Sequence, residues 1–205
     1  MTRKSGGYEQ ICNDLMKQLS TFDLAANAPY IGLAPNDDGS INLTFFGREY
    51  RAEAGKVCPL DGRETGVNHL SLIAHYLMSP GRGEPSYSFL PLGRMSGMVE
   101  GRGTYDRDAV NKPLASRFDG RLSDLSRAAE RIGGKPEGRA PNGGLCWLFH
   151  PFPKVPVRLV HQEADLEFPA DFRLLFDTTA LNFMEFEALA FLAGVFVSEM
   201  CSALE

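Results

Sequence analysis

The sequence predicts an α+β fold, a single domain in which an antiparallel sheet packs against several helices. Apolar residues recur at helical spacing in several separate segments, and strand-like runs gather between residues 145 and 177. The regular strand–helix–strand alternation of parallel sheets is absent. The 205 residues show no internal repeat and no linker, so we expect one domain over residues 1–205, with residues 1–7 disordered.

Helices are predicted where apolar residues recur every three or four positions. They cover residues 8–25, 67–78, 113–118, 121–132 and 182–204. Gly133 and Gly134 end the fourth of these, because glycine readily takes the left-handed conformation that closes a helix. Glu185 and Glu187 lie near the start of the last, where acidic groups suit the positive end of the helix dipole.

Strands are predicted from alternating or short apolar runs. Residues 41–54 indicate a hairpin with Gly47 in its turn, and residues 145–152, 155–162 and 172–177 indicate three further strands. Residues 58–66 are expected to form a loop. Residues 79–113 are rich in glycine and arginine, and we expect a long irregular loop there, of the kind that usually carries function or is poorly ordered.

Composition excludes several classes of protein. Hydrophobic residues make up 43 % and charged residues 23 %, which are ordinary values for a folded domain, and a net charge of −5 argues against non-specific nucleic-acid binding. The longest apolar run, residues 188–197, is too short to cross a membrane. The four cysteines, Cys12, Cys58, Cys146 and Cys201, form no C-x-x-C pair, and the N-terminus lacks the apolar core of a signal peptide. We therefore expect reduced thiols in the cytoplasm.

The segment "VRLVHQEADLEFPADFRLLFD" places Glu163, Asp165 and Glu167 at every second position. On a continuous strand these carboxylates share one face with His161, and His161, Glu163 and Asp165 become candidate metal ligands, because hard cations prefer several oxygens. Two other readings stay open. The segment can be a solvated bend that Pro169 ends, or Asp165 and Glu167 can bond to backbone amides of their own turn and hold two strands together.

A second metal hypothesis depends on strand register. If residues 145–150 and 157–162 form an antiparallel hairpin centred on "PFPKVP", His150 faces Val157 and Cys146 faces His161. Cys146, His150 and His161 then share a face and offer soft ligands, although a slip of one residue separates them. A buried cysteine that acts only as a small apolar side chain is the alternative.

A ligand site is predicted from the irregular segment. Arg94, Arg102 and Arg107 alternate with glycines, and backbone amides beside arginines can hold phosphate or carboxylate, although no P-loop spacing is present. Trp147 and Tyr105 would supply apolar contact, while Asp165 and Glu167 would orient the loop. The alternative is a turn-rich loop without a ligand. No nucleophile motif occurs, so catalytic residues stay unassigned.

Several stretches together resemble one protein family. They are "HLSLIAHYLMSPG", "NKPLASRF" followed by "AAERIGGKP", "FPKVPVRLVHQEADLEFPADFRLLFDTTA" and "FMEFEALA". This order resembles the bacterial and archaeal family known as domain of unknown function 3786, from about residue 8 to residue 200. The resemblance implies Asp165, Glu167, Phe168 and Pro169 as signature positions. It also implies a link to anaerobic corrinoid and one-carbon metabolism, through relatives fused to a cysteine-rich iron–sulfur module that this chain lacks.

Three functions remain open on these grounds. The leading hypothesis is an accessory domain that binds a cofactor or small anion of unknown identity, in anaerobic one-carbon or redox metabolism. The second is a metal-dependent hydrolytic enzyme that uses the acidic cluster. The third is a protein-interaction scaffold in which the acidic turn binds a basic partner. Neither nucleic acid nor a membrane is expected as a partner.

Overall fold

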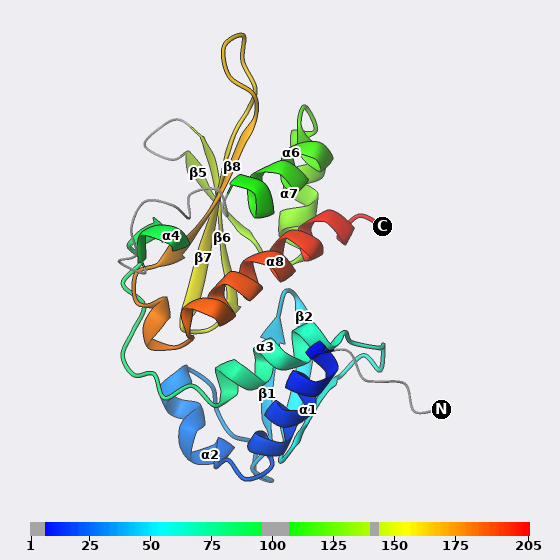
Figure 1. Ribbon diagram of the computed structural model, residues 1–205, viewed down its shortest axis with the longest axis vertical. Coiled ribbons are helices and arrows are strands. Elements are labelled where there is room, and N and C mark those ends of the chain that lie inside the picture. Colours follow the sequence, from blue (N-terminus) through cyan, green and yellow to red (C-terminus); the bar gives the residue numbers. More distant parts are fainter. Residues whose placement is uncertain (1–6, 96–106, 140–143) are drawn as a thin grey trace.

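The computed structural model describes residues 7–95, 107–139 and 144–205, and in these residues it confirms an α+β fold. Two antiparallel sheets are present, one of three strands in the order β1-β2-β3 and one of five strands in the order β4-β8-β7-β6-β5. The three-stranded sheet and its helices lie at one end of the molecule, and the five-stranded sheet lies at the other (Figure 1).

The first half of the chain builds the smaller sheet. Its elements are α1 (Gly7–Leu19), α2 (Leu24–Asn27), η1 (Ala28–Ile31), β1 (Ile41–Phe45), β2 (Arg48–Glu53), β3 (Lys56–Pro59) and α3 (Val67–Leu77). The predicted helix over 8–25 is divided, because the Asp23 carboxylate accepts the Ala26 amide (3.0 Å) and starts α2. The predicted hairpin is confirmed, with Gly47 at φ +75° in its turn. Strand β3 was not predicted, and its last two residues, Cys58 and Pro59, fall in the expected 58–66 loop.

The second half builds the larger sheet. Its strands are β4 (Phe89–Pro91), β5 (Lys135–Arg139), β6 (Leu145–Phe152), β7 (Val155–Gln162) and β8 (Asp171–Asp177). Its helices are α4 (Leu92–Met95), the single π-helical turn η2 (Arg107–Asn111), α6 (Lys112–Phe118), α7 (Leu122–Arg131), η3 (Ala180–Asn182) and α8 (Phe186–Ser202). The three strands predicted between residues 145 and 177 are confirmed. The expected irregular loop over 79–113 is confirmed for residues 79–88, which have no helix or strand, but was wrong for the rest of its described part, which contains β4, α4, η2 and the start of α6.

Asp177 fastens the segment before β4 to the end of β8. Its fully buried carboxylate accepts hydrogen bonds from the Ser86 amide (3.2 Å) and from the Thr179 amide (2.9 Å). Burial opposes ionisation of this carboxyl group, but the hydrogen bonds from Thr179 and Ser86 outweigh it and lower its pKa. An acidic residue at the end of an apolar strand is therefore a structural anchor here.

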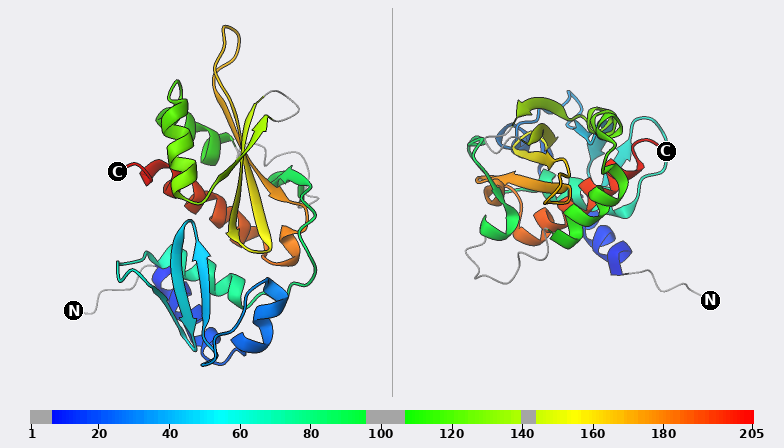
Figure 2. Two further views of the ribbon diagram at one scale, coloured as in Figure 1. Left: turned by 180° about the vertical axis from the view of Figure 1, so that it is seen from behind. Right: turned by 90° about the horizontal axis from the view of Figure 1, so that it is seen from above.

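Helix α8 joins the two halves. It lies against one face of the five-stranded sheet, where Phe149 of β6 meets Phe196 edge-on with 4.9 Å between ring centres (Figures 1 and 2). Phe46 of the first half contacts the same Phe196 ring (5.9 Å). One continuous apolar cluster therefore runs from Leu19 of α1 to Met200 of α8. Among the described residues, no helix combines the length and apolar character needed to cross a membrane.

Candidate functional site

The acidic segment is a turn, not a strand. Strand β7 ends at Gln162, so Glu163, Asp165 and Glu167 do not line one strand face, and that interpretation was wrong. Asp165 Oδ1 accepts the amides of Glu167 and Phe168, each at 2.8 Å, and the Asp165 amide donates to the Phe168 carbonyl (2.9 Å). The two accepted amides lower the pKa of Asp165. The interpretation that these acids bond to backbone amides of their own turn is thus confirmed for Asp165, whereas no such bond of the Glu167 carboxylate is present among the described residues.

The metal hypotheses lack a ligand cluster in the described chain. Across residues 7–95, 107–139 and 144–205, no three His, Cys, Asp or Glu side chains gather closely enough to hold a metal ion. This includes His161, Glu163 and Asp165. His161 is instead buried, with an exposed fraction of 2 %, and stacks on Phe172 with 4.3 Å between ring centres.

The register that would unite Cys146, His150 and His161 was wrong by one residue. Next to the turn, Phe152 pairs with Val155, as a hairpin centred on that loop requires. A bulge between Phe149 and Phe152 then shifts the pairing, so Phe149 faces Val157 and Leu145 faces His161. Cys146 therefore points to the opposite face of the sheet from His161, because side chains alternate along a strand.

The predicted ligand residues occupy separate places. Arg94 is exposed on α4, whereas Trp147 is buried within the apolar core. Asp165 and Glu167 lie in the turn at the outer end of the β7–β8 hairpin, well away from α4 in both views (Figures 1 and 2). Arg102 and Tyr105 lie outside the described residues, as does the side chain of Arg107. The described residues thus do not bring this set together.

A cleft of about 700 Å³ lies instead between the two halves of the molecule. Its walls are the β1–β2 turn, the loop from β3 to α3, and the C-terminal ends of α7 and α8. It is lined by Phe46, Gly47, Arg48, Glu49, Leu60, Asp61, Arg63, Glu64, Arg131, Ile132, Glu199, Ser202 and Ala203. This volume is typical of sites for small molecules.

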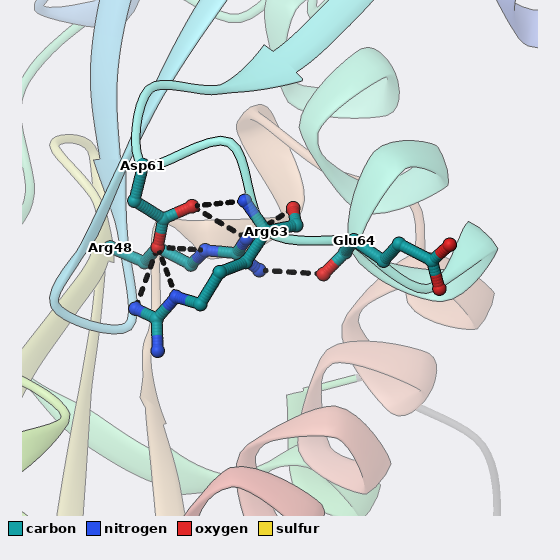
Figure 3. Close-up of polar contacts among 4 residues, drawn as sticks. All are labelled: Arg48, Asp61, Arg63 and Glu64. Atoms are coloured by element: carbon teal, nitrogen blue, oxygen red, sulfur yellow. Dashed lines mark hydrogen bonds and ion pairs between the residues drawn. The ribbon is translucent and has the colours of Figure 1, made fainter.

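Arg48, the first residue of β2, organises one wall of the cleft. Its Nε donates to Asp61 Oδ2 (3.0 Å) and its Nη2 to Asp61 Oδ1 (2.8 Å), a two-bonded pair. It also donates to the carbonyl oxygens of Arg63 (2.6 Å) and Glu64 (3.2 Å), as Figure 3 shows. One guanidinium therefore fixes the whole loop between β3 and α3.

Arg63 binds the same carboxylate from the solvent side. Its Nε lies 2.7 Å and its Nη2 2.6 Å from Asp61 Oδ2. The hydrogen bond from Arg48, helped by those of Arg63, holds the pKa of Asp61 far below its ordinary value against a smaller opposing effect of burial. The Glu64 carboxylate points away from both guanidiniums (Figure 3). Two arginines thus share one carboxylate, so this three-residue cluster carries one excess positive charge, while Glu49 and Glu64 also line the cleft.

Glu199, which lines the cleft, contacts a partly buried polar group of residues that do not line it. His69 Nε2 lies 2.9 Å from Glu199 Oε1, which ties α3 to α8. The Arg48 guanidinium lies 5.5 Å from the centre of the Tyr50 ring, and burial raises the pKa of the Tyr50 hydroxyl despite the opposing influence of Thr65 and Arg48. Thr65 Oγ1 is buried near this hydroxyl, and no contact of ordinary hydrogen-bond geometry reaches it within the described residues.

Sequence reasoning missed this cleft because it missed β3. Arg48 and Asp61 are brought together by the antiparallel pairing of β2 with β3, in which Tyr50 faces Pro59. The available signal was the two-residue turn Ala54-Gly55 between Glu53 and Lys56, with Gly55 at φ +72°.

The match to a family model covers most of this architecture. A model described as "Domain of unknown function (DUF3786)" matches residues 23–199, which include both sheets and every wall of the cleft except its last α8 residues. The chain belongs to this family. No curated protein and no solved structure matches it. Membership of DUF3786 confirms the resemblance seen in the sequence, and the description of the family names no activity.

Proposed function

We propose that this DUF3786 chain is an accessory binding domain that holds a small anionic molecule, one bearing a carboxylate or phosphate, in the cleft beside Arg63. The observation that carries the proposal is the sharing of Asp61 by Arg48 and Arg63. The charge of an incoming anion would be compensated by the second guanidinium. The anion would bind in a polar cleft, so no charge would be transferred from water into an apolar site.

The two arginines would have different roles. Arg48 already donates to one carboxylate and two carbonyl groups, so it would position the loop. The Arg63 side chain is 76 % exposed, and the described structure engages only its Nε and Nη2. Its Nη1 and the remaining Nη2 proton would bind the ligand. Arg131, which also lines the cleft, would add a second cation.

The opposite wall carries Glu199 as well as Arg131 and would set the orientation of the ligand. Glu199 and the C-terminal ends of α7 and α8 carry negative charge or partial negative charge. A helix end contributes roughly 0.3–1 kcal/mol, whereas a hydrogen bond to a charged group contributes about 1.5–3 kcal/mol. The arginines would therefore hold the anionic end, and a hydroxyl or amino group of the ligand would face Glu199.

Binding measurements with a matched pair of variants test this proposal. Isothermal titration at low salt would use inorganic phosphate, succinate and adenosine monophosphate as probes. We expect Arg63→Ala to weaken the best probe at least about tenfold, as for loss of a charge-assisted hydrogen bond. Arg173→Ala is the control, because Arg173 pairs with Asp171 (2.6 Å) two residues earlier, as Arg63 pairs with Asp61. Equal effects of the two variants, or no saturable binding, would contradict the proposal.

The other expectations from the sequence stay predictions. A role of Arg94, Arg102, Tyr105 and Arg107 in the same ligand, and a place in anaerobic one-carbon or redox metabolism, are untested. Work in a reducing cytoplasm is supported by the four cysteines, none of which forms a disulfide within the described residues. The metal-dependent hydrolase has no ligand cluster among the described residues to support it.

A further inference from the structure

The β7–β8 hairpin carries apolar side chains at its outermost point. The turn over residues 163–170 projects beyond the rest of the molecule in two views (Figures 1 and 2). Within it Leu166 has an exposed fraction of 105 % and Phe168 of 66 %. Exposed large apolar side chains are common singly, but two of them two residues apart at the tip of a projection form a small apolar contact surface.

The tip is held in one conformation by its own hydrogen bonds. Asp165 Oδ1 accepts the amides of Glu167 and Phe168, and the Asp165 amide donates to the Phe168 carbonyl. At the base, Gln162 pairs with Asp171 and Ala170 is buried. Leu166 and Phe168 are therefore displayed on an ordered support, which reduces the entropy that a docking partner must overcome.

The charge around the tip selects among possible partners. Glu163, Asp165 and Glu167 alternate with the apolar residues, and among the described residues no basic side chain pairs with them. Asp171 at the base is paired with Arg173. Carboxylates so close to Leu166 and Phe168 oppose insertion into a phospholipid surface, which is commonly anionic. A protein surface whose apolar pocket is bordered by Lys or Arg fits both features.

We propose that the tip of the β7–β8 hairpin is a docking knob for another protein, with Leu166 and Phe168 entering an apolar pocket that Lys or Arg side chains border. This proposal does not depend on the anion-binding cleft, which lies between the two halves of the molecule. The acidic residues would steer the partner and set its register, and the two apolar side chains would hold it.

Photo-crosslinking from chosen positions tests this docking. The full chain, produced in the cells from which its gene comes, would carry p-benzoylphenylalanine at position 168 or, as control, at position 11, where Ile11 is 51 % exposed on α1. We expect one dominant adduct from position 168 that position 11 does not give. Mass spectrometry should place the adduct in a folded partner beside apolar residues flanked by Lys or Arg.

Reconstitution with that purified partner decides the chemistry. Leu166→Ser combined with Phe168→Ser should raise the Kd at least about tenfold. Glu167→Lys, as a separate variant, should raise the Kd by a larger factor at low salt than at high salt. Ile11→Ser should leave the Kd unchanged. The double variant should unfold at the same temperature midpoint as the unaltered chain, because both side chains are exposed. A lower midpoint would therefore reveal a folding defect separately from any change in Kd. Equal adducts from both positions, an adduct with lipid or a second copy, or an unchanged Kd would overturn the proposal.

Discussion

Arg48 and Asp61 form a two-bonded ion pair, with 3.0 Å from Nε to Oδ2 and 2.8 Å from Nη2 to Oδ1. The pair fixes the β3–α3 loop, because the same guanidinium also binds two carbonyl oxygens of that loop. Arg48→Lys keeps the charge but loses the fork geometry. We expect a lower midpoint of thermal unfolding and weaker anion binding, whereas Arg173→Lys should alter neither. An Arg48→Lys chain as stable as the unaltered one would show that the pair is dispensable.

Gly47 brings the β1–β2 turn against the end of α7. It lies at φ +75°, and a Cβ atom there would approach the Arg131 carbonyl oxygen to 2.8 Å. Gly39 has a similar φ of +78° but no heavy atom within 4 Å of such a Cβ. Each Gly→Ala change should cost about 1–2 kcal/mol from the left-handed backbone. Gly47→Ala should cost more in urea unfolding because of the added contact, and equal losses would contradict this packing.

The hairpin tip should depend on Asp165 locally. Asp165→Ala removes the acceptor of the Glu167 and Phe168 amides, so hydrogen exchange at these two amides should become faster. The midpoint of thermal unfolding should hardly change, because the turn is exposed. Glu163→Ala, for which no such acceptor bond is present among the described residues, is the control. Unchanged exchange at both amides would mean that Asp165 does not order the turn.

Acid sensitivity should come partly from His161. Burial lowers its pKa below the ordinary value of 6.5, despite the opposing influence of Asp171 and Glu163, and its Nδ1 has no hydrogen bond within the described chain. Below pH 6.5 the unfolded chain therefore binds a proton that the folded chain resists, so the free energy of unfolding falls as the pH falls.

His161→Leu should flatten this pH dependence, measured by urea unfolding at about pH 7.5 and about pH 5.5. His150→Leu is the comparison. His150 is exposed although its pKa is also lowered by burial and by Lys135, so its replacement should change the slope less. A slope that His161→Leu leaves unaltered would show that this imidazole is protonated at no cost in the folded chain.

Elements with a clear apolar period could be predicted from the sequence. Helix α3 was expected over 67–78 and ends at Leu77, and α7 ends just before Gly133, which has a φ of +87°. Strand β5, Lys135–Arg139, could not be predicted in this way. It contains proline and glycine, all its residues are exposed, and only pairing with β6 makes it a strand.

The site was harder to predict because it depends on contacts between distant residues. Nothing near Arg48 in the sequence indicates that its partner is Asp61, since the contact requires β3 to be recognised first. The metal hypothesis failed for a related reason. A single bulge near Phe149 decides whether Cys146 lies on the same face of the sheet as His161. Bulges leave little trace in a sequence.

The hydrogen bond between Ser86 and Asp177 joins residues 91 positions apart, and this separation bears on the order of assembly. Strands β6, β7 and β8 follow one another through short connections, so they can pair early at small entropic cost. Strand β4 has three residues and pairs with β8 from a segment far earlier in the chain. We therefore expect β4 to be the last strand to dock during folding and the first to detach in native-state fluctuations.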